Sequence, residues 1–187
     1  MRKGFTLLEL IIVLAIALVC FLIVLGMYIS QSKLYTNESD ISELQTINSI
    51  AQEAISGTIE QGMEIIETRT INGIPYTSDS NTIIVKLPAY NASKQIINGI
   101  YDYVVFDFDS ENSKIISNTE IGTGSARLPS EKMIADFAGA LNFRYNDTVW
   151  SSVNNIEIVI VTKKEVGGVE REERTFKTVQ LKNKQIY

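Results

Sequence analysis

The sequence predicts an α+β protein in which one long N-terminal helix, first transmembrane and then amphipathic, packs on an antiparallel β-sheet. Three observations support this fold class. Leu10–Ile29 is a run of 20 residues without a charge, which as a helix is long enough to cross about 30 Å of hydrocarbon. A stripe of apolar residues at helical spacing follows this run. Segments of alternating polarity, typical of strands, fill the C-terminal half.

Charges flank the apolar run unequally. Arg2 and Lys3 precede it, so by the positive-inside bias we expect a cytoplasmic N-terminus and a domain on the other side of the membrane. Beyond residue 4, 15 of the 17 basic residues remain against all 22 acidic ones, a net charge of −7. This balance predicts no general nucleic-acid-binding surface, although it leaves room for a local basic patch.

Missing residue types exclude several kinds of site. The sequence has no histidine and a single cysteine, Cys20, which lies inside the apolar run. A metal site built on imidazole, a catalytic histidine and a disulfide within the outer domain are therefore excluded. No P-loop, G-x-S-x-G, paired Cys-x-x-Cys or H-E-x-x-H motif occurs, and no cofactor is expected.

The helical pattern continues past the apolar run. We expect a continuous helix from Phe5 to Ser56, which ends at Gly57 or gains a further turn or two within Ile59–Ile66. A short coiled coil is the alternative for the stripe, but sustained heptads are lacking. The stripe consists of apolar residues at spacings of three, four and seven: Leu34, Ile41, Leu44, Ile47, Ala51 and Ile55.

The remaining sequence has the period of strands. The clearest hairpin is the last, because apolar and polar residues alternate before a turn at Gly167–Gly168 and the chain returns through residues 174–182. A short helix is expected at Met133–Ala140. Further strands are expected at Thr82–Leu87, Ile97–Phe108, 113–117 and Ala140–Tyr145.

Three interpretations of the opening segment compete. A secretory signal peptide has an apolar core of about 7 to 15 residues followed by a cleavage site with small residues. Here the run is longer, and "GMYISQS" offers no such site. A plain N-terminal anchor would leave Glu9 at the cytoplasmic interface, where a carboxylate costs little. The third interpretation depends on the stretch "KGFTLLE".

This stretch resembles the leader and cleavage site of type IV pilins and of the pseudopilins of type II secretion. In that family a basic leader ends in glycine, a membrane peptidase cuts on the cytoplasmic side, and the new N-terminal residue is methylated. The resemblance implies cleavage between Gly4 and Phe5 and N-methylation of Phe5. It makes Glu9 the family glutamate, the fifth residue of the processed chain, and it implies a pilin-like fold.

With this resemblance the chain divides into four expected parts. Residues 1–4 form the leader, 5–29 the transmembrane and filament-core helix, and 30–56 the amphipathic half of the same helix. Residues 57–187 form a globular, β-rich head domain, and this soluble region is long enough to bury a core of its own.

The leader also gives Glu9 a partner. An intramembrane carboxylate is costly unless it is paired, and a cut after Gly4 creates an α-ammonium group on Phe5. Phe5 and Glu9 lie four residues apart, so a pair within one helix is one solution. In the family the glutamate is thought to meet the amine of a neighbouring subunit, which implies that Glu9 sets the axial register during assembly.

One position departs from the family pattern. The family often has a helix-disturbing proline in the apolar run, whereas this sequence has no proline before Pro75. Gly26 lies in that region, and glycine weakens a helix by about 1 kcal/mol relative to alanine. We therefore expect Gly26 to loosen the helix locally, with close helix–helix approach as the alternative. The length and the missing proline favour a minor over a major subunit.

Two loops carry residues that suggest ligands. Asp107, Asp109 and Glu111 resemble the start of a calcium loop, but no glycine stands at its sixth position and no acidic ligand follows at the required spacing. A solvated turn is the alternative, and no metal site is predicted. The glycines of Gly122–Arg127 lack the strand–turn–helix context of a phosphate loop and predict a flexible loop.

The sequence therefore predicts a non-enzymatic filament subunit, a minor pilin or pseudopilin of a type IV pilus or of a related secretion or DNA-uptake filament. The resemblance implies four partners: other pilin or pseudopilin subunits, the prepilin peptidase and methyltransferase, a membrane-embedded assembly platform and the lipid bilayer. The subunit would be a single-pass protein of the cytoplasmic membrane before it enters an extracellular or periplasmic filament. The alternatives are a bitopic ligand-binding or sensory protein that does not polymerise, and a membrane-tethered enzyme that uses only aspartate and glutamate.

Overall fold

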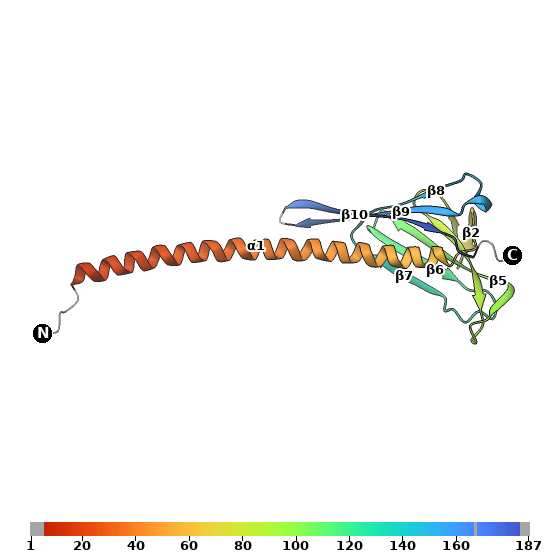
Figure 1. Cartoon of the computed structure of the whole chain (residues 1–187), viewed down its shortest axis with the longest axis horizontal. Coiled ribbons are helices and arrows are strands. Elements are labelled where there is room, and N and C mark those ends of the chain that lie inside the picture. The colour runs from red at the N-terminus through yellow and green to blue at the C-terminus, as the bar shows by residue number, and fades with distance from the viewer. Residues whose placement is uncertain (1–5, 167, 184–187) are drawn as a thin grey trace. The chain divides into compact units, whose positions relative to one another are not determined.

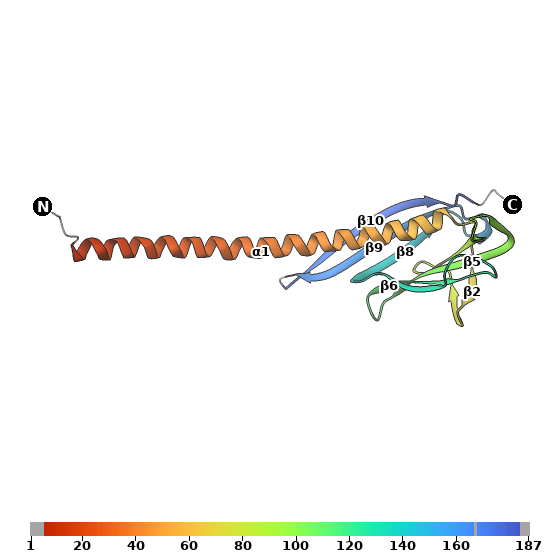
Figure 2. The same ribbon diagram turned by 90° about the horizontal axis from the view of Figure 1, so that it is seen from below.

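A computed structural model describes residues 6–166 and 168–183 of the chain. It confirms the predicted fold class, because helix α1 (Leu7–Glu60) is followed by antiparallel sheets (Figures 1 and 2). The helix continues past Gly57 to Glu60, which is the longer of the two predicted ends. The chain forms two compact units that divide within α1, residues 1–40 and 41–187, and each is described by itself.

The first unit contains the apolar part of α1. Its large side chains are exposed all round the helix, for example Leu7 at 77%, Phe21 at 58% and Val24 at 61%. The helix is long and apolar enough to cross a membrane, with a mean hydropathy of 3.3 in its most apolar window. A helix that is apolar on every side needs lipid or other helices around it. These properties support membrane anchoring.

In the second unit, one face of α1 between residues 41 and 60 is buried against the strands. Leu44, Ala51, Ile55 and Ile59 are each at most 1% exposed. Their spacings of seven, four and four return the chain to the same side of a helix with 3.6 residues per turn. Leu34, the first residue of the predicted stripe, belongs to the first unit and is 58% exposed, so its place in the stripe stays a prediction.

Two larger antiparallel sheets and a small hairpin make up the strands of the described residues. The five-stranded sheet has the order β1-β4-β5-β6-β7, the three-stranded sheet has the order β10-β9-β8, and β2 pairs with β3. The bounds are β1 (Glu64–Ile65), β2 (Thr68–Ile71), β3 (Ile74–Thr77), β4 (Ile83–Tyr90), β5 (Ile96–Asp109), β6 (Lys114–Glu120), β7 (Ser130–Ala135), β8 (Ala138–Tyr145), β9 (Asn155–Val166) and β10 (Val169–Gln180), with a 3-10 turn at Trp150–Ser152.

The main core lies between the two sheets and α1. It joins Ile55 of α1, Val85 and Phe106 of the five-stranded sheet, and Ile158 of the three-stranded sheet. Figure 1 shows β8–β10 on one side of the last turns of α1 and β5–β7 on the other. The helix therefore contributes side chains to a core that both sheets enclose, as expected for one apolar face on an amphipathic helix.

The predicted C-terminal hairpin is confirmed. Strands β9 and β10 pair over 12 residues, from Val166 opposite Val169 to Asn155 opposite Gln180. Gly168 has a φ of 79°, a conformation that glycine adopts without strain, whereas Gly167 lies outside the described residues. The hairpin forms because the inward-facing isoleucines of β9 are fully buried.

A row of polar side chains joins α1 to β10. Asn48 donates from Nδ2 to the carbonyl oxygen of Glu173 at 3.0 Å, and Lys177 donates from Nζ to Ser56 Oγ at 2.9 Å. Eight helical residues rise about 12 Å and four strand residues about 13 Å, so the distance between the two contacts is nearly the same along the helix as along the strand.

Some buried polar atoms have no hydrogen-bond partner within the described residues. Among them are Asn48 Oδ1 and the hydroxyls of Thr162 and Thr175.

The short helix predicted at Met133–Ala140 was wrong. Residues 130–135 form β7, which pairs with β6, and β8 begins at Ala138. Between these strands Phe137 has a φ of 56°, and its backbone N–H donates to Asp136 Oδ1 at 2.9 Å. A residue in this left-handed region interrupts a right-handed helix, and pairing with β6 satisfies the backbone groups instead.

Strands β1, β2 and β3 were not predicted. The β2–β3 hairpin turns at Asn72 and Gly73, whose φ angles are 52° and 86°. Two positive φ angles in a two-residue turn are typical of the type I′ turn that Asn-Gly favours. The dipeptide between Ile71 and Ile74 was therefore a signal in the sequence. Ile71 is fully buried with Ile84 and Val105 in a second, smaller cluster.

Candidate functional site

The first candidate site is the start of α1. Of its predicted residues, Gly4 and Phe5 lie outside the described residues, whereas Glu9 lies in the first turn of the helix. Two groups of Thr6 donate to Glu9 Oε2, the backbone N–H at 2.9 Å and the hydroxyl at 3.0 Å. In return the backbone N–H of Glu9 donates to Thr6 Oγ1 at 3.3 Å. This reciprocal arrangement is a capping box.

The capping box gives Glu9 partners within its own chain. The first N–H groups of a helix have no carbonyl partner inside the helix and favour a carboxylate nearby. This role was not predicted, although a threonine three residues before a glutamate at a helix start is its known signature. The predicted pairing of Glu9 with an N-terminal amine remains a prediction.

Gly26 lies within α1, and the helix is assigned without interruption across it. A Cβ atom added at this position would meet nothing within 4 Å. Within this chain, packing therefore does not require a glycine here. Both expectations for Gly26, local loosening and approach by another helix, stay predictions.

Two of the three weak calcium candidates, Asp107 and Asp109, accept hydrogen bonds within the head, and those of Asp109 hold the turn after β5. Asp107 Oδ1 accepts a hydrogen bond from the Thr82 hydroxyl at 2.5 Å. Asp109 Oδ1 accepts the backbone N–H groups of Glu111 and Asn112, both at 3.1 Å. The pKa of Asp109 is lowered, chiefly by the side-chain hydrogen bond from Asn112. No group of three acidic, histidine or cysteine side chains among the described residues is placed to hold a metal ion.

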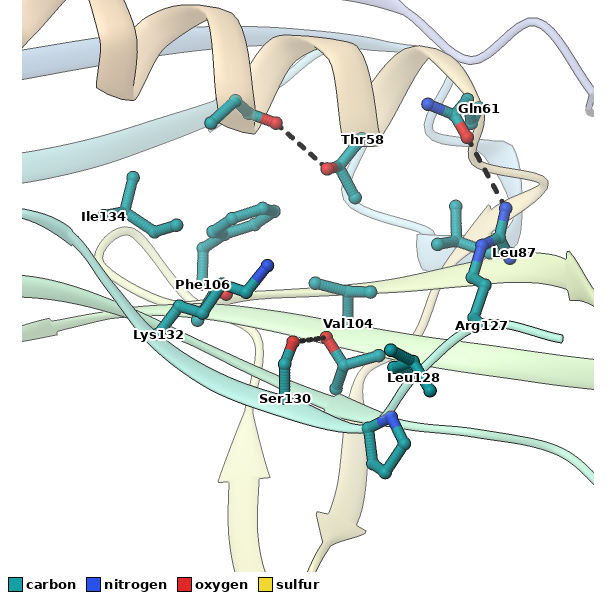
Figure 3. Close-up of a pocket in the computed structure, with 14 residues that line it drawn as sticks. Thr58, Gln61, Leu87, Val104, Phe106, Arg127, Leu128, Ser130, Lys132 and Ile134 are labelled. Atoms are coloured by element: carbon teal, nitrogen blue, oxygen red, sulfur yellow. Dashed lines mark hydrogen bonds between the residues drawn. The ribbon is translucent and has the colours of Figure 1, made fainter. Parts of the chain in front are cut away.

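A second candidate site is a cavity of about 630 Å³ in the head, shown in Figure 3. Its size falls within the range of about 300–1,000 Å³ that is common for ligand pockets. Its floor comes from β4–β6 and is mostly apolar, and one wall is the last two turns of α1. The other wall is β7 with the loop before it. The residues are Leu87, Val104, Phe106, Ser117 and Thr119; Ala54, Thr58 and Gln61; and Arg127, Leu128, Pro129, Ser130, Lys132 and Ile134.

The loop at one end of this cavity is held by a buried carboxylate. Asp102 is fully buried, and its carboxylate accepts the backbone N–H of Gly122 and the hydroxyl of Ser125, each at 2.8 Å. Arg127 pairs with the same carboxylate at 2.8 Å and also donates to the carbonyl oxygen of Pro88 at 2.7 Å. The loop predicted to be flexible is therefore fixed by specific hydrogen bonds. We call these contacts the Asp102 clasp.

The clasp sets the boundary between two cavities. Arg127 Nη2 lies 3.4 Å from Gln61 Oε1 at the end of α1, as the dashed line in Figure 3 shows. A second cavity of about 500 Å³ lies on the other side of this contact and includes Tyr90 and Lys94. Arg127 and Gln61 line both cavities. Neither cavity was predicted, because the lining residues are far apart in the sequence, and Asp102 carried no local signal of its role.

The model of a protein family described as the prokaryotic N-terminal methylation motif matches residues 1–25, so the predicted motif at the start of the chain is confirmed. A search of curated proteins finds no match. Among solved structures the chain is similar to a type IV-like pilin from Thermus thermophilus, with 8% sequence identity and a TM-score of 0.48. That alignment covers 75% of this chain and 96% of the other.

Proposed function

We propose that the chain is a structural, non-enzymatic subunit of a type IV pilus or of a related filament. The observation that carries the proposal is the N-terminal methylation motif at residues 1–25, which runs directly into a helix with exposed apolar side chains on every side. Such a helix needs lipid before assembly and other helices after it. Both needs are met by a subunit that leaves the membrane for a packed filament core.

The proposed maturation begins with a cut between Gly4 and Phe5 by a prepilin peptidase, followed by methylation of the Phe5 amine. The N-terminus faces the cytoplasm before the cut, since Arg2 and Lys3 precede the apolar run. The subunit is then drawn by an assembly platform into a filament outside the membrane. Within the family, the chain is a minor pilin or pseudopilin, a preference supported by its length and by the absence of a proline in the apolar run.

The N-terminal mass of the protein from its native cells tests this proposal. We expect a chain that begins at Phe5 and carries one methyl group on its α-amine. The control is a Gly4→Leu variant, which should keep residues 1–4 because its cleavage site is blocked. A native chain that still carries Met1–Gly4 would contradict the proposal and favour a bitopic anchor with a ligand-binding head.

A further inference from the structure

The cavity between α1 and β7 has no task in the proposed function, and its lining has an unusual charge. The chain has 22 acidic and 17 basic residues. Among the 14 residues that line this cavity, however, two are basic, Arg127 and Lys132, and none is acidic. A cavity with cations only, in an acidic protein, favours an anionic occupant.

The two cations differ in how far their charge is already neutralised. Arg127 is paired with Asp102, whose side chain is completely buried behind it. Lys132 is an exposed residue, and no carboxylate among the described residues forms an ion pair with it. Figure 3 shows Lys132 on β7, next to Ser130 and on the wall that faces α1. The unneutralised charge of the cavity is therefore that of Lys132.

The lining also offers one exposed apolar side chain and hydroxyl groups. Val104 and Phe106 on the floor are only 7% and 2% exposed and leave an occupant little area to cover, and Ser117 and Thr119 beside them are 6% and 8% exposed. Leu128 at the cavity's end is 82% exposed. An occupant that gains from these groups has apolar side chains as well as a negative charge, which a simple inorganic anion lacks.

Strand β7 borders the cavity and is the last strand of its sheet. Within the described residues it pairs with β6 on one side, and no strand pairs with its other side. The free backbone N–H and carbonyl groups of an edge strand can pair with an extended peptide, while alternate side chains of that peptide occupy a neighbouring cavity. The edge therefore favours a peptide over a small molecule.

We propose that this cavity and the free edge of β7 bind an extended peptide segment of a partner protein that carries carboxylate and apolar side chains. The carboxylate pairs with Lys132, an apolar side chain covers Leu128, and the peptide backbone pairs with β7. The Asp102 clasp holds the end wall in place. The proposal assigns a recognition surface to the head, separate from the N-terminal helix that the proposed function uses.

The test uses the full chain in detergent micelles and a labelled, capped seven-residue peptide of alternating glutamate and valine. Binding is followed by fluorescence anisotropy and by amide chemical shifts of Ser117 and Lys132. We expect saturable binding that weakens with added salt and falls about threefold in Lys132→Gln and at least tenfold in Lys132→Glu, since one partly exposed ion pair is lost or reversed.

Glu131→Gln is the matched control, because Glu131 neighbours Lys132 on β7 but does not line the cavity. This variant should bind the peptide within about twofold of the unmodified chain. Unfolding followed by the fluorescence of Trp150 should be the same in all variants, which separates lost binding from lost folding.

Four results would overturn the proposal. The first is equal affinity for the same peptide with glutamine in place of glutamate. The second is unchanged affinity in Lys132→Glu. The third is an equal shift of Ser117 and Lys132 with sodium acetate alone, which would leave only a simple anion site. The fourth is a concentration-dependent shift of the same amides without peptide, which would make the occupant a second copy of this chain.

Discussion

At the scale of single residues, Thr162 on β9 shows how the hydrogen bonding of one hydroxyl sets its contribution to stability. Its hydroxyl oxygen is buried and has no hydrogen-bond partner among the described residues. A buried polar group without a partner costs about 1–3 kcal/mol of desolvation. We expect Thr162→Val, which keeps the shape and removes the hydroxyl, to raise the free energy of unfolding by about 1 kcal/mol. Urea unfolding of the full chain in detergent, followed by Trp150 fluorescence, measures this.

The matched control for Thr162 is Thr82→Val. The Thr82 hydroxyl donates to Asp107 at 2.5 Å, so its removal should lower the free energy of unfolding by about 1 kcal/mol. Equal losses in both variants would show that the Thr162 hydroxyl has a partner in solution.

The pKa of Glu60, the last residue of α1, depends on its contact with Lys182. The hydrogen bond and then the charge of Lys182 lower the pKa of Glu60 below its ordinary value of 4.5. Because the folded-state pKa is below the unfolded one, the pair stabilises the fold above pH 4.5 and loses this effect as the pH falls through the folded value. Lys182→Gln should raise the Glu60 midpoint in an NMR titration, whereas Lys114→Gln should leave it unchanged.

At the scale of elements, the loop between β6 and β7 depends on the Asp102 clasp. Asp102→Ala leaves the half-buried Arg127 without its carboxylate and removes the acceptor of Gly122 and Ser125. Breaking a buried pair on one side costs about 3–5 kcal/mol. We expect a loss of about 3 kcal/mol in the same urea experiment, since Arg127 keeps 23% exposure of its side chain.

The exposed pair of Arg144 and Glu157 provides the contrast to the clasp. These side chains are 68% and 37% exposed, and their charged atoms lie 3.6 Å apart. Glu157→Ala should cost less than about 1 kcal/mol, because solvent screens the pair. A loss of the same size in Asp102→Ala would mean that water replaces the clasp.

Some helices and strands could be predicted from the sequence and others could not. The transmembrane and amphipathic parts of α1 and the β9–β10 hairpin were predicted because their periods are long and regular. Strand β7 was mistaken for a helix because its six residues have no clear period, and pairing with β6 decides its structure. Strands β2 and β3 were missed because four residues each are too few for a pattern, although Asn72 and Gly73 marked their turn.

The two candidate sites also differ in how far the sequence predicts them. The N-terminal methylation motif could be predicted because its residues are adjacent in the sequence. The cavity unites residues from α1, four strands and a loop that are up to 80 positions apart, such as Ala54 and Ile134. The spacing of residues in the sequence does not predict such a cavity, because the order of the strands in the sheet brings its lining residues together.

At the scale of the whole molecule, the proposed filament gives Glu9 two sets of partners. In the single chain its carboxylate accepts two hydrogen bonds from Thr6. In the filament we expect it to meet the amine of a neighbouring Phe5. Glu9→Ala should therefore leave the cut after Gly4 largely intact and lower incorporation into filaments at least tenfold, measured as the ratio of processed subunit in sheared filaments to that in membranes.

Glu38→Ala is the control for Glu9, because Glu38 is an exposed carboxylate on the same helix, beyond the apolar run. This variant should assemble like the unmodified chain. Normal incorporation of Glu9→Ala would remove the pairing role and leave the capping box as the only task of Glu9.

The capping box also makes the helix start independent of the proposed cut. Only Phe5 would remain in front of Thr6 after cleavage, and every hydrogen bond of the box joins Thr6 to Glu9. Precursor and processed chain would thus begin their helix at the same residue. Maturation would remove Arg2 and Lys3 and create a methylated amine on Phe5, while the start of the helix stays at the same residue. An assembly machine would then distinguish precursor from processed chain by these N-terminal groups and not by a change in the helix.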